Sequence, residues 1–180
     1  MNLPNKLTLA RICMIPFFVF FLLDNGIAFS NYIAVIIFII ACLTDALDGH
    51  IARKYNLISN FGKFMDPLAD KLLVSSALIC FVQLNLVPAW IVIVIISREF
   101  IISGFRLVAS DNGIVIAASW WGKFKTTAQM IMSILLIVDF SGSFFNTLEQ
   151  IFIYVALIFT VISLLDYLIK NIKVLKEGSK

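Results

Sequence analysis

Apolar residues occupy most of the chain in long runs, and clusters of polar residues separate these runs into six segments. The spacing predicts six helices, over residues 12–23, 31–52, 66–84, 88–109, 125–140 and 147–169. Two uninterrupted apolar runs, 12–23 and 32–44, are shorter than the roughly 20 residues that cross a bilayer. Each gives way to polar residues at one end, so the polar ends are expected to line a water-filled cavity that opens on one side of a membrane.

The connections between these helices also carry local signals. Residues 55–64 are polar and predict a loop, after which Asp66 is expected to cap the third helix, with Pro67 in its first turn. Residues 114–123 contain a tryptophan pair and predict a loop or surface segment at the membrane boundary.

The first and last apolar segments carry further signals about where helices begin. The run 12–23 has the length of the apolar part of a signal peptide, but five further apolar stretches follow it, so a retained first helix is expected. Thr147 with Gln150 has the spacing of a capping box and predicts the start of the sixth helix.

Composition and charge place these helices in a membrane. Of 180 residues, 61% are apolar, which is typical of an integral membrane protein. The 14 Lys and Arg residues avoid the connections 24–30, 85–88 and 141–146. The positive-inside rule therefore predicts a multi-pass protein of the plasma (inner) membrane, with both termini and the polar cavity facing the cytoplasm. We expect one all-α domain over residues 1–180, in contact with membrane lipids, and no nucleic-acid partner.

Four carboxylates stand at the edges of the second and third apolar segments. Asp45 and Asp48 are three residues apart, and Asp66 and Asp70 are four apart, so each pair lies on one face of its helix. A lone pair is more often a solvated helix end, but two pairs beside apolar segments favour a ligand site. Clustered carboxylates require hard cations, which predicts Mg²⁺ or Mn²⁺, with two ions as in phosphoryl-transfer sites.

Basic residues form a second group. Its members are Arg98, Arg106, Lys123, Lys125 and Lys63. Arg98 lies about ten residues into a span, where an unpartnered guanidinium costs at least about 2.5 kcal/mol, so a bound anion or an acidic group is expected beside it. The neighbouring Glu99 is not expected to face Arg98 on a helix. These residues are candidates for a substrate phosphate, although lysines at a membrane boundary also attract anionic lipid.

Residues 45–70 match the pattern Asp-x2-Asp-Gly-x2-Ala-Arg-x8-Gly-x3-Asp-x3-Asp at every fixed position. The chain thereby resembles the CDP-alcohol phosphatidyltransferase family. The resemblance implies six helices, a homodimer, a general-base role for Asp70 and metal ligation by the motif aspartates, Asp70 among them. It also implies a CDP-binding set that comprises Gly49, Ala52, Arg53 and Gly62, with Asn5 and Thr8 as weaker candidates.

Segments 2–11, 97–106 and 122–126 look like one bacterial branch of that family. Members of this branch join CDP-diacylglycerol to sn-glycerol 3-phosphate and release CMP. Inositol phosphate and phosphatidylglycerol stay open as alternative acceptors. An ion-coupled transporter is less consistent with the sequence, because the second half does not repeat the first. His50 occupies an unspecified motif position, turned about 200° from Asp48 on a helix, which disfavours it as the general base.

Overall fold

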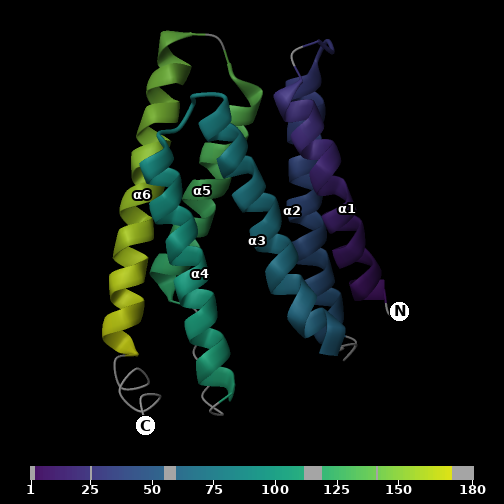
Figure 1. Cartoon of the computed structure of the whole chain (residues 1–180), viewed down its shortest axis with the longest axis vertical. Coiled ribbons are helices and arrows are strands. Elements are labelled where there is room, and N and C mark those ends of the chain that lie inside the picture. The colour runs from purple at the N-terminus through teal and green to yellow at the C-terminus, as the bar shows by residue number, and fades with distance from the viewer. Residues whose placement is uncertain (1–2, 25, 55–59, 112–118, 141, 172–180) are drawn as a thin grey trace. The chain divides into compact units, whose positions relative to one another are not determined.

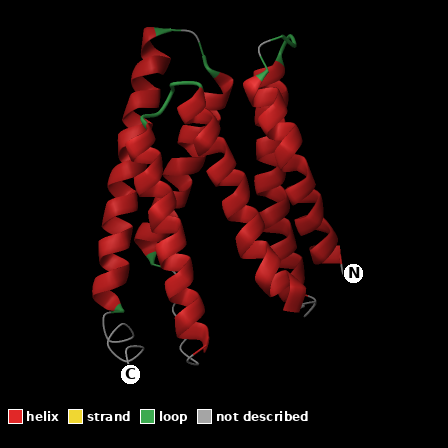
Figure 2. Ribbon diagram, viewed as in Figure 1, coloured by secondary structure: helices red, strands yellow, loops and turns green. Residues whose placement is uncertain are grey.

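The computed structural model describes residues 3–24, 26–54, 60–111, 119–140 and 142–171, which contain six helices and no strand (Figures 1 and 2). The helices are α1 (Leu3–Leu23), α2 (Ser30–Lys54), α3 (Asn60–Gln83), α4 (Ala89–Asp111), α5 (Trp120–Val138) and α6 (Ser143–Lys170). The prediction of six helices is confirmed for this part of the chain.

The helices divide between two compact units. The first unit comprises Met1–Leu86 with Ile137–Asp139, and the second comprises Val87–Leu136 with Phe140–Lys180. In the first unit, α1 packs against both α2 and α3, which also contact each other. Its core includes the rings of Phe18 and Phe38, whose centroids are 5.6 Å apart. Small residues such as Ala34, Ala41 and Ala77, each fully buried, allow these helices to approach closely.

In the second unit, α4 packs against α6. Ile91 and Ile95 of α4 are fully buried, as is Ala156 of α6. Near the other end of the pair, the ring of Tyr167 meets Phe105 edge to face, with 5.7 Å between centroids. Such aromatic pairs add to the stabilisation from apolar burial, so α4 and α6 form a well-defined helix pair.

The third helix begins earlier than the sequence predicts. Since α3 starts at Asn60, Asp66 is not its N-cap, and Pro67 lies within the helix instead of in its first turn. Polar composition between residues 60 and 64 did not prevent helix formation, because polarity alone does not distinguish a loop from the exposed end of a helix.

The starts of α5 and α6 also differ from expectation. Trp120 begins α5 within the segment that was predicted as a loop or surface segment. The Gly122 amide, in the first turn of α5, donates to Oγ of Ser119, the residue just before the helix. The capping-box prediction for α6 is wrong, because Thr147 lies inside the helix and its hydroxyl donates to the Ser143 carbonyl. Threonine hydroxyls commonly form such bonds to the preceding helical turn.

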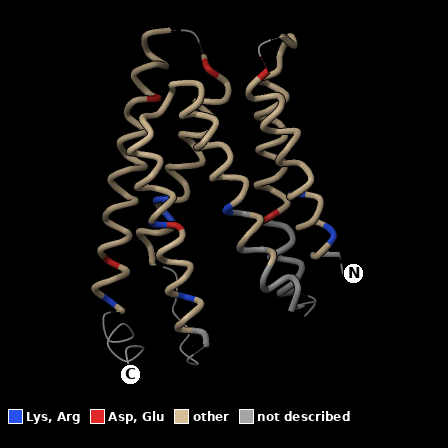
Figure 3. The backbone as a smooth tube through the Cα atoms, in the orientation of Figure 1, with Lys and Arg blue, Asp and Glu red and all other residues tan. Residues whose placement is uncertain are grey.

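The outer surface of these helices is strongly apolar. Large side chains such as Phe17, Phe20, Ile93 and Leu107 are each more than half exposed. Charged residues are sparse along the helices (Figure 3). Within the described residues, Asn5–Leu23 and Ser143–Lys170 are long and apolar enough to cross a membrane. Widespread exposure of large apolar side chains is costly in water, and it is favourable against lipid.

Candidate active site

The four motif aspartates lie on two helices of the first unit. Positions 45 and 48 share one face of α2, and positions 66 and 70 share one face of α3. The side chains of Asp48, Asp66 and Asp70 lie outside the described residues. Among the side chains that the structure describes, no three acidic, histidine or cysteine groups form a metal cluster, and that set contains only Asp45 of the four. The contact between α2 and α3 brings the two halves of the motif into one unit.

Asp45 is held by an arginine from α1. The Nη1 atom of Arg11 donates to Asp45 Oδ1 at 2.5 Å. The Arg11 side chain is fully buried, whereas that of Asp45 is 39% exposed. A buried guanidinium requires an anionic partner, and a carboxylate has lone pairs left after accepting one such bond. Asp45 can therefore stay ion-paired while it offers oxygen to a metal ion, and the all-carboxylate donor set of the motif fits Mg²⁺ or Mn²⁺.

Arg11 belongs to a buried polar face of α1. Asn5, Thr8 and Arg11 follow one another at intervals of three residues and are 6%, 0% and 0% exposed. This spacing places them along one side of the helix. The two weaker candidates for CDP binding, Asn5 and Thr8, thus lie on the same face as the residue that holds Asp45. Sequence reasoning missed Arg11 as a site residue, although its spacing from Thr8 could have identified it.

The other predicted CDP-binding residues occupy the motif helices. Gly49, Ala52 and Arg53 lie on α2, and Gly62 and Lys63 lie on α3. Their side-chain surroundings lie outside the described residues, so their assignment stays a prediction.

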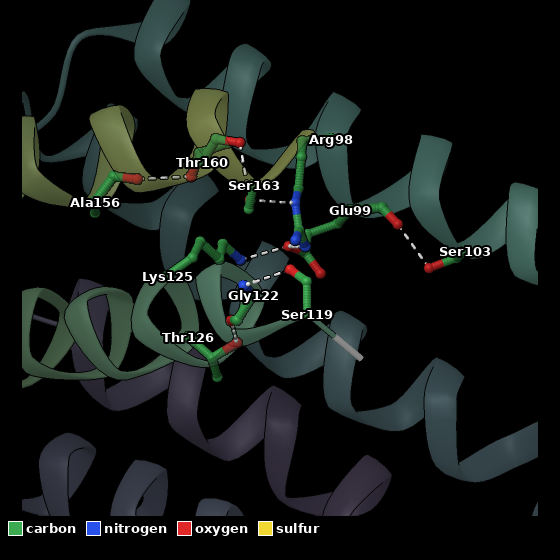
Figure 4. A network of polar contacts seen from close by, with 10 residues as sticks. All are labelled: Arg98, Glu99, Ser103, Ser119, Gly122, Lys125, Thr126, Ala156, Thr160 and Ser163. Carbon is green, nitrogen blue, oxygen red and sulfur yellow. Dashed lines mark hydrogen bonds and ion pairs between the residues drawn. The ribbon is translucent and has the colours of Figure 1, made fainter. Parts of the chain in front are cut away.

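A second polar centre lies in the second unit (Figure 4). Arg98 Nε donates to Ser163 Oγ at 3.1 Å, and Arg98 Nη1 donates to Glu99 Oε1 at 2.8 Å. Lys125 Nζ of α5 donates to the same Glu99 oxygen. We refer to Arg98, Glu99, Lys125 and Ser163 as the cationic cluster. The expected acidic partner of Arg98 is therefore Glu99, and the prediction that these neighbours do not meet is wrong, since two long side chains can fold together beside a helix.

The two cations of the cationic cluster are buried. Arg98 and Lys125 are 9% and 3% exposed, and both donate to the same oxygen of Glu99. Among the described residues, Arg98 Nη2 makes no hydrogen bond, and it lies beside Gly122: a Cβ atom built at Gly122 would be 3.6 Å from it. A weakly hydrated guanidinium edge beside a residue without a side chain can receive an anion such as phosphate.

Arg106 and Lys123 lie apart from this network. The Arg106 guanidinium is 5.9 Å from the centre of the Tyr167 ring, and Lys123 Nζ is 4.3 Å from the centre of the Trp120 ring. Both side chains are exposed. Within the described part of the chain, no hydrogen bond or ion pair joins either residue to the cationic cluster. The structure thus brings together two of the predicted phosphate-binding residues, Arg98 and Lys125.

The polar face of α5 continues beyond Lys125. Gln129 and Ser133 follow at intervals of four residues and are 3% and 1% exposed. Among the described residues, Gln129 Nε2 and Ser133 Oγ have no hydrogen-bond partner. A buried polar group without a partner destabilises the folded state by about 1–3 kcal/mol. Two such groups on one helix face are therefore not explained by packing alone. Sequence analysis missed this face, although the repeat of four residues could have revealed it.

Comparison with known proteins agrees with the motif. The family model for CDP-alcohol phosphatidyltransferases matches residues 1–162. A Bacillus subtilis protein named CDP-diacylglycerol–glycerol-3-phosphate 3-phosphatidyltransferase is 49% identical over 99% of both chains. A Haemophilus influenzae protein of the same name is 42% identical over 93% of this chain and 91% of its own length. A Mycobacterium tuberculosis protein named probable phosphatidylglycerophosphate synthase is 38% identical over 96% of this chain and 82% of its own.

The chain therefore belongs to the CDP-alcohol phosphatidyltransferase family. This family consists of integral membrane enzymes that generally use divalent metal ions. Membership fits the apolar helix surfaces and the acidic motif described above.

Proposed function

We propose that this protein transfers the phosphatidyl group of CDP-diacylglycerol to sn-glycerol 3-phosphate, giving phosphatidylglycerophosphate and CMP. The observation that carries the proposal is the full-length similarity to relatives named for this reaction. The cationic cluster supports a phosphate-bearing acceptor, because Arg98 and Lys125 bring two buried cations together.

Asp45, Asp48, Asp66 and Asp70 would hold two Mg²⁺ or Mn²⁺ ions. When bound, these ions neutralise the pyrophosphate of CDP-diacylglycerol and the charge that develops on departing CMP. The acidic donor set and the exposed fraction of Asp45 support this assignment. Arg11 fixes one oxygen of Asp45 and so limits the orientations that its carboxylate can adopt.

Asp70 would act as the general base. Its carboxylate takes the proton from the acceptor hydroxyl, and the hydroxyl oxygen attacks the phosphorus that carries diacylglycerol. The bond between that phosphorus and the oxygen leading to CMP breaks, and CMP departs. Position 70 lies one helical turn beyond position 66 on α3, which supports a base close to the carboxylates that hold the pyrophosphate.

The two substrates would use different groups of residues. The CDP moiety contacts the small or basic motif residues Gly49, Ala52, Arg53 and Gly62, with Asn5 and Thr8 of α1 beside it. The acceptor phosphate binds Arg98 and Lys125, with the remaining basic residues Arg106, Lys123 and Lys63 drawing the anion towards the site. The buried positions of Asn5 and Thr8, on the face that carries Arg11, support their inclusion.

We place residues 1–180 in one membrane domain with six spans and a polar cavity that faces the cytoplasm. Both termini lie on the cytoplasmic side of the plasma membrane, and the protein forms a homodimer. The distribution of Lys and Arg supports the orientation. Access from the cytoplasm suits a water-soluble acceptor, and contact with lipid suits a substrate with two acyl chains.

An acceptor panel tests the proposal. The purified full chain in detergent is supplied with CDP-diacylglycerol, Mg²⁺ and, in separate reactions, glycerol 3-phosphate, inositol phosphate, phosphatidylglycerol or glycerol. CMP release and the lipid product are then measured. Glycerol 3-phosphate should give the fastest release, with phosphatidylglycerophosphate as the product. Faster transfer to another acceptor contradicts the proposed substrate, and no CMP release with any alcohol contradicts the proposed reaction.

A further inference from the structure

We infer that Glu99 is a positioning residue for the acceptor phosphate, which it serves by holding Arg98 and Lys125 together as one anion-binding unit. This inference rests on the proposed function and extends it to a residue outside the motif and outside the basic group identified from sequence. Glu99 is itself an anion, so it acts on the acceptor through its two cationic partners.

The convergence of two cations on one oxygen carries the inference. Arg98 Nη1 and Lys125 Nζ both donate to Glu99 Oε1, although they come from different helices, α4 and α5. Both cations are buried, so their mutual repulsion is poorly screened. Without the shared carboxylate the repulsion would drive the flexible lysine away from Arg98. With it, the two positive groups stay adjacent.

Ser163 completes the arrangement from α6. Its hydroxyl donates to the Thr160 carbonyl at 3.0 Å, which leaves its oxygen lone pairs free to accept from Arg98 Nε at 3.1 Å. The planar guanidinium is thus fixed at two of its three nitrogens, by Ser163 and by Glu99. The third nitrogen, Nη2, lies beside Gly122, where a Cβ atom built on the glycine would be 3.6 Å from it. A phosphate that binds there meets a guanidinium whose orientation is already set.

A simple neutralising role for Glu99 makes a different prediction. A carboxylate that only lowers the cost of burying two cations would change folding or stability when replaced, with both substrates affected alike. A carboxylate that positions the cations for one substrate changes the Michaelis constant for that substrate. The two roles are therefore separated by comparing the two Michaelis constants.

The experiment uses the full chain with Glu99→Gln, Ser163→Ala and the matched control Ser103→Ala. Ser103 Oγ donates to the backbone carbonyl of Glu99 and does not touch its carboxylate. Glu99→Gln is expected to raise the KM for glycerol 3-phosphate about tenfold, and Ser163→Ala about threefold, with the KM for CDP-diacylglycerol changed less than about twofold. Ser103→Ala should leave both constants near their original values. Ser163→Ala removes the acceptor of Arg98 Nε and the hydroxyl's own bond to the Thr160 carbonyl, but it leaves every charge of the cluster in place, so it tests the arrangement even where Glu99→Gln reduces folded yield.

A double-mutant cycle with Lys125→Met adds a second readout. If Glu99 acts by holding Lys125, the effect of Glu99→Gln on the KM for glycerol 3-phosphate should shrink when Lys125 is already absent. Three outcomes overturn the inference while wild-type transfer to glycerol 3-phosphate stands. They are an unchanged or lowered KM for glycerol 3-phosphate in Glu99→Gln, equal increases in both Michaelis constants, and full additivity in the cycle. Failure of the wild type to use glycerol 3-phosphate overturns the proposed function, and this inference with it.

Discussion

Each of the two units buries charged side chains beside a partner of opposite sign, and the signs are reversed between the units. In the first unit, the buried Arg11 pairs with the motif aspartate Asp45. In the second unit, one carboxylate, Glu99, pairs with two buried cations. In each unit the partner of opposite sign restricts the orientations of the charged groups that it contacts. Under the proposed function, the carboxylates of the first unit bind metal ions and the cations of the second bind a phosphate.

The largest expected effect tests the acidic unit. Removing divalent ions with a chelator should abolish CMP release, and Mg²⁺ or Mn²⁺ should restore it, because carboxylates cannot hold a pyrophosphate without a cation between them. CMP release is measured across a titration of metal. Asp45→Asn should shift that titration to higher Mg²⁺ and recover activity at saturation. Full turnover in excess chelator would remove the basis for treating the first unit as a metal site.

The next effect separates chemistry from binding within the same unit. Asp70→Asn keeps the shape of the side chain but cannot accept a proton, so kcat should fall by about 10²- to 10⁴-fold at saturating metal. The affinity for CDP-diacylglycerol should change much less. Rates are compared at several Mg²⁺ concentrations. A parallel loss of Mg²⁺ and nucleotide affinity would mean that metal coordination outweighs base catalysis, and near-normal turnover would make His50 the next candidate.

A smaller effect is expected in the cationic unit. Arg98→Ala removes the guanidinium that contacts Glu99 and Ser163, and it should raise the KM for glycerol 3-phosphate by about 10- to 100-fold. The KM for CDP-diacylglycerol should stay within about threefold. Arg106→Ala is the matched control, since Arg106 is exposed and lies over the Tyr167 ring. Equal effects of the two substitutions would contradict the distinction between clustered and peripheral cations.

The smallest effect concerns the space beside Arg98. Gly122→Ala adds a methyl group 3.6 Å from Arg98 Nη2, an ordinary contact that does not strain the helix. By covering part of that nitrogen, it should raise the KM for glycerol 3-phosphate about two- to fivefold, with thermal stability maintained or slightly increased because alanine favours helix. Both quantities are measured on the same preparation. An unchanged KM would show that the phosphate does not approach Nη2 from this side.

The helices could be predicted from sequence because they depend on local pattern. Apolar runs identified all six helices, and the spacing of the motif aspartates survives because α2 and α3 are continuous through it. The helix starts were less predictable. Asn60 begins α3 within a segment that polarity predicted as a loop, and Trp120 begins α5 within a segment that its tryptophan pair predicted as a loop or surface segment.

The partners within the site could not be predicted, because they join residues that are distant in sequence. Arg11 meets Asp45 across 34 positions, and Arg98 meets Ser163 across 65. No local spacing carries that information. Glu99 was not predicted as the partner of Arg98, because ideal helix geometry fixes the directions of the Cβ atoms but not the reach of long side chains. The hydroxyl of Ser163 gave no signal, since a serine in an apolar helix usually bonds its own backbone.

The central claim is that the first unit binds metal and the second binds the acceptor. Its most direct test is a side-by-side measurement on Asp66→Asn and Arg98→Ala. In one assay of CMP release, the Mg²⁺ activation constant and the KM for glycerol 3-phosphate are determined for both variants and for the wild type. The account predicts that Asp66→Asn raises the Mg²⁺ requirement with little change in acceptor KM, and that Arg98→Ala does the reverse. If both variants shift both constants to the same extent, the two units do not divide metal and acceptor binding between them.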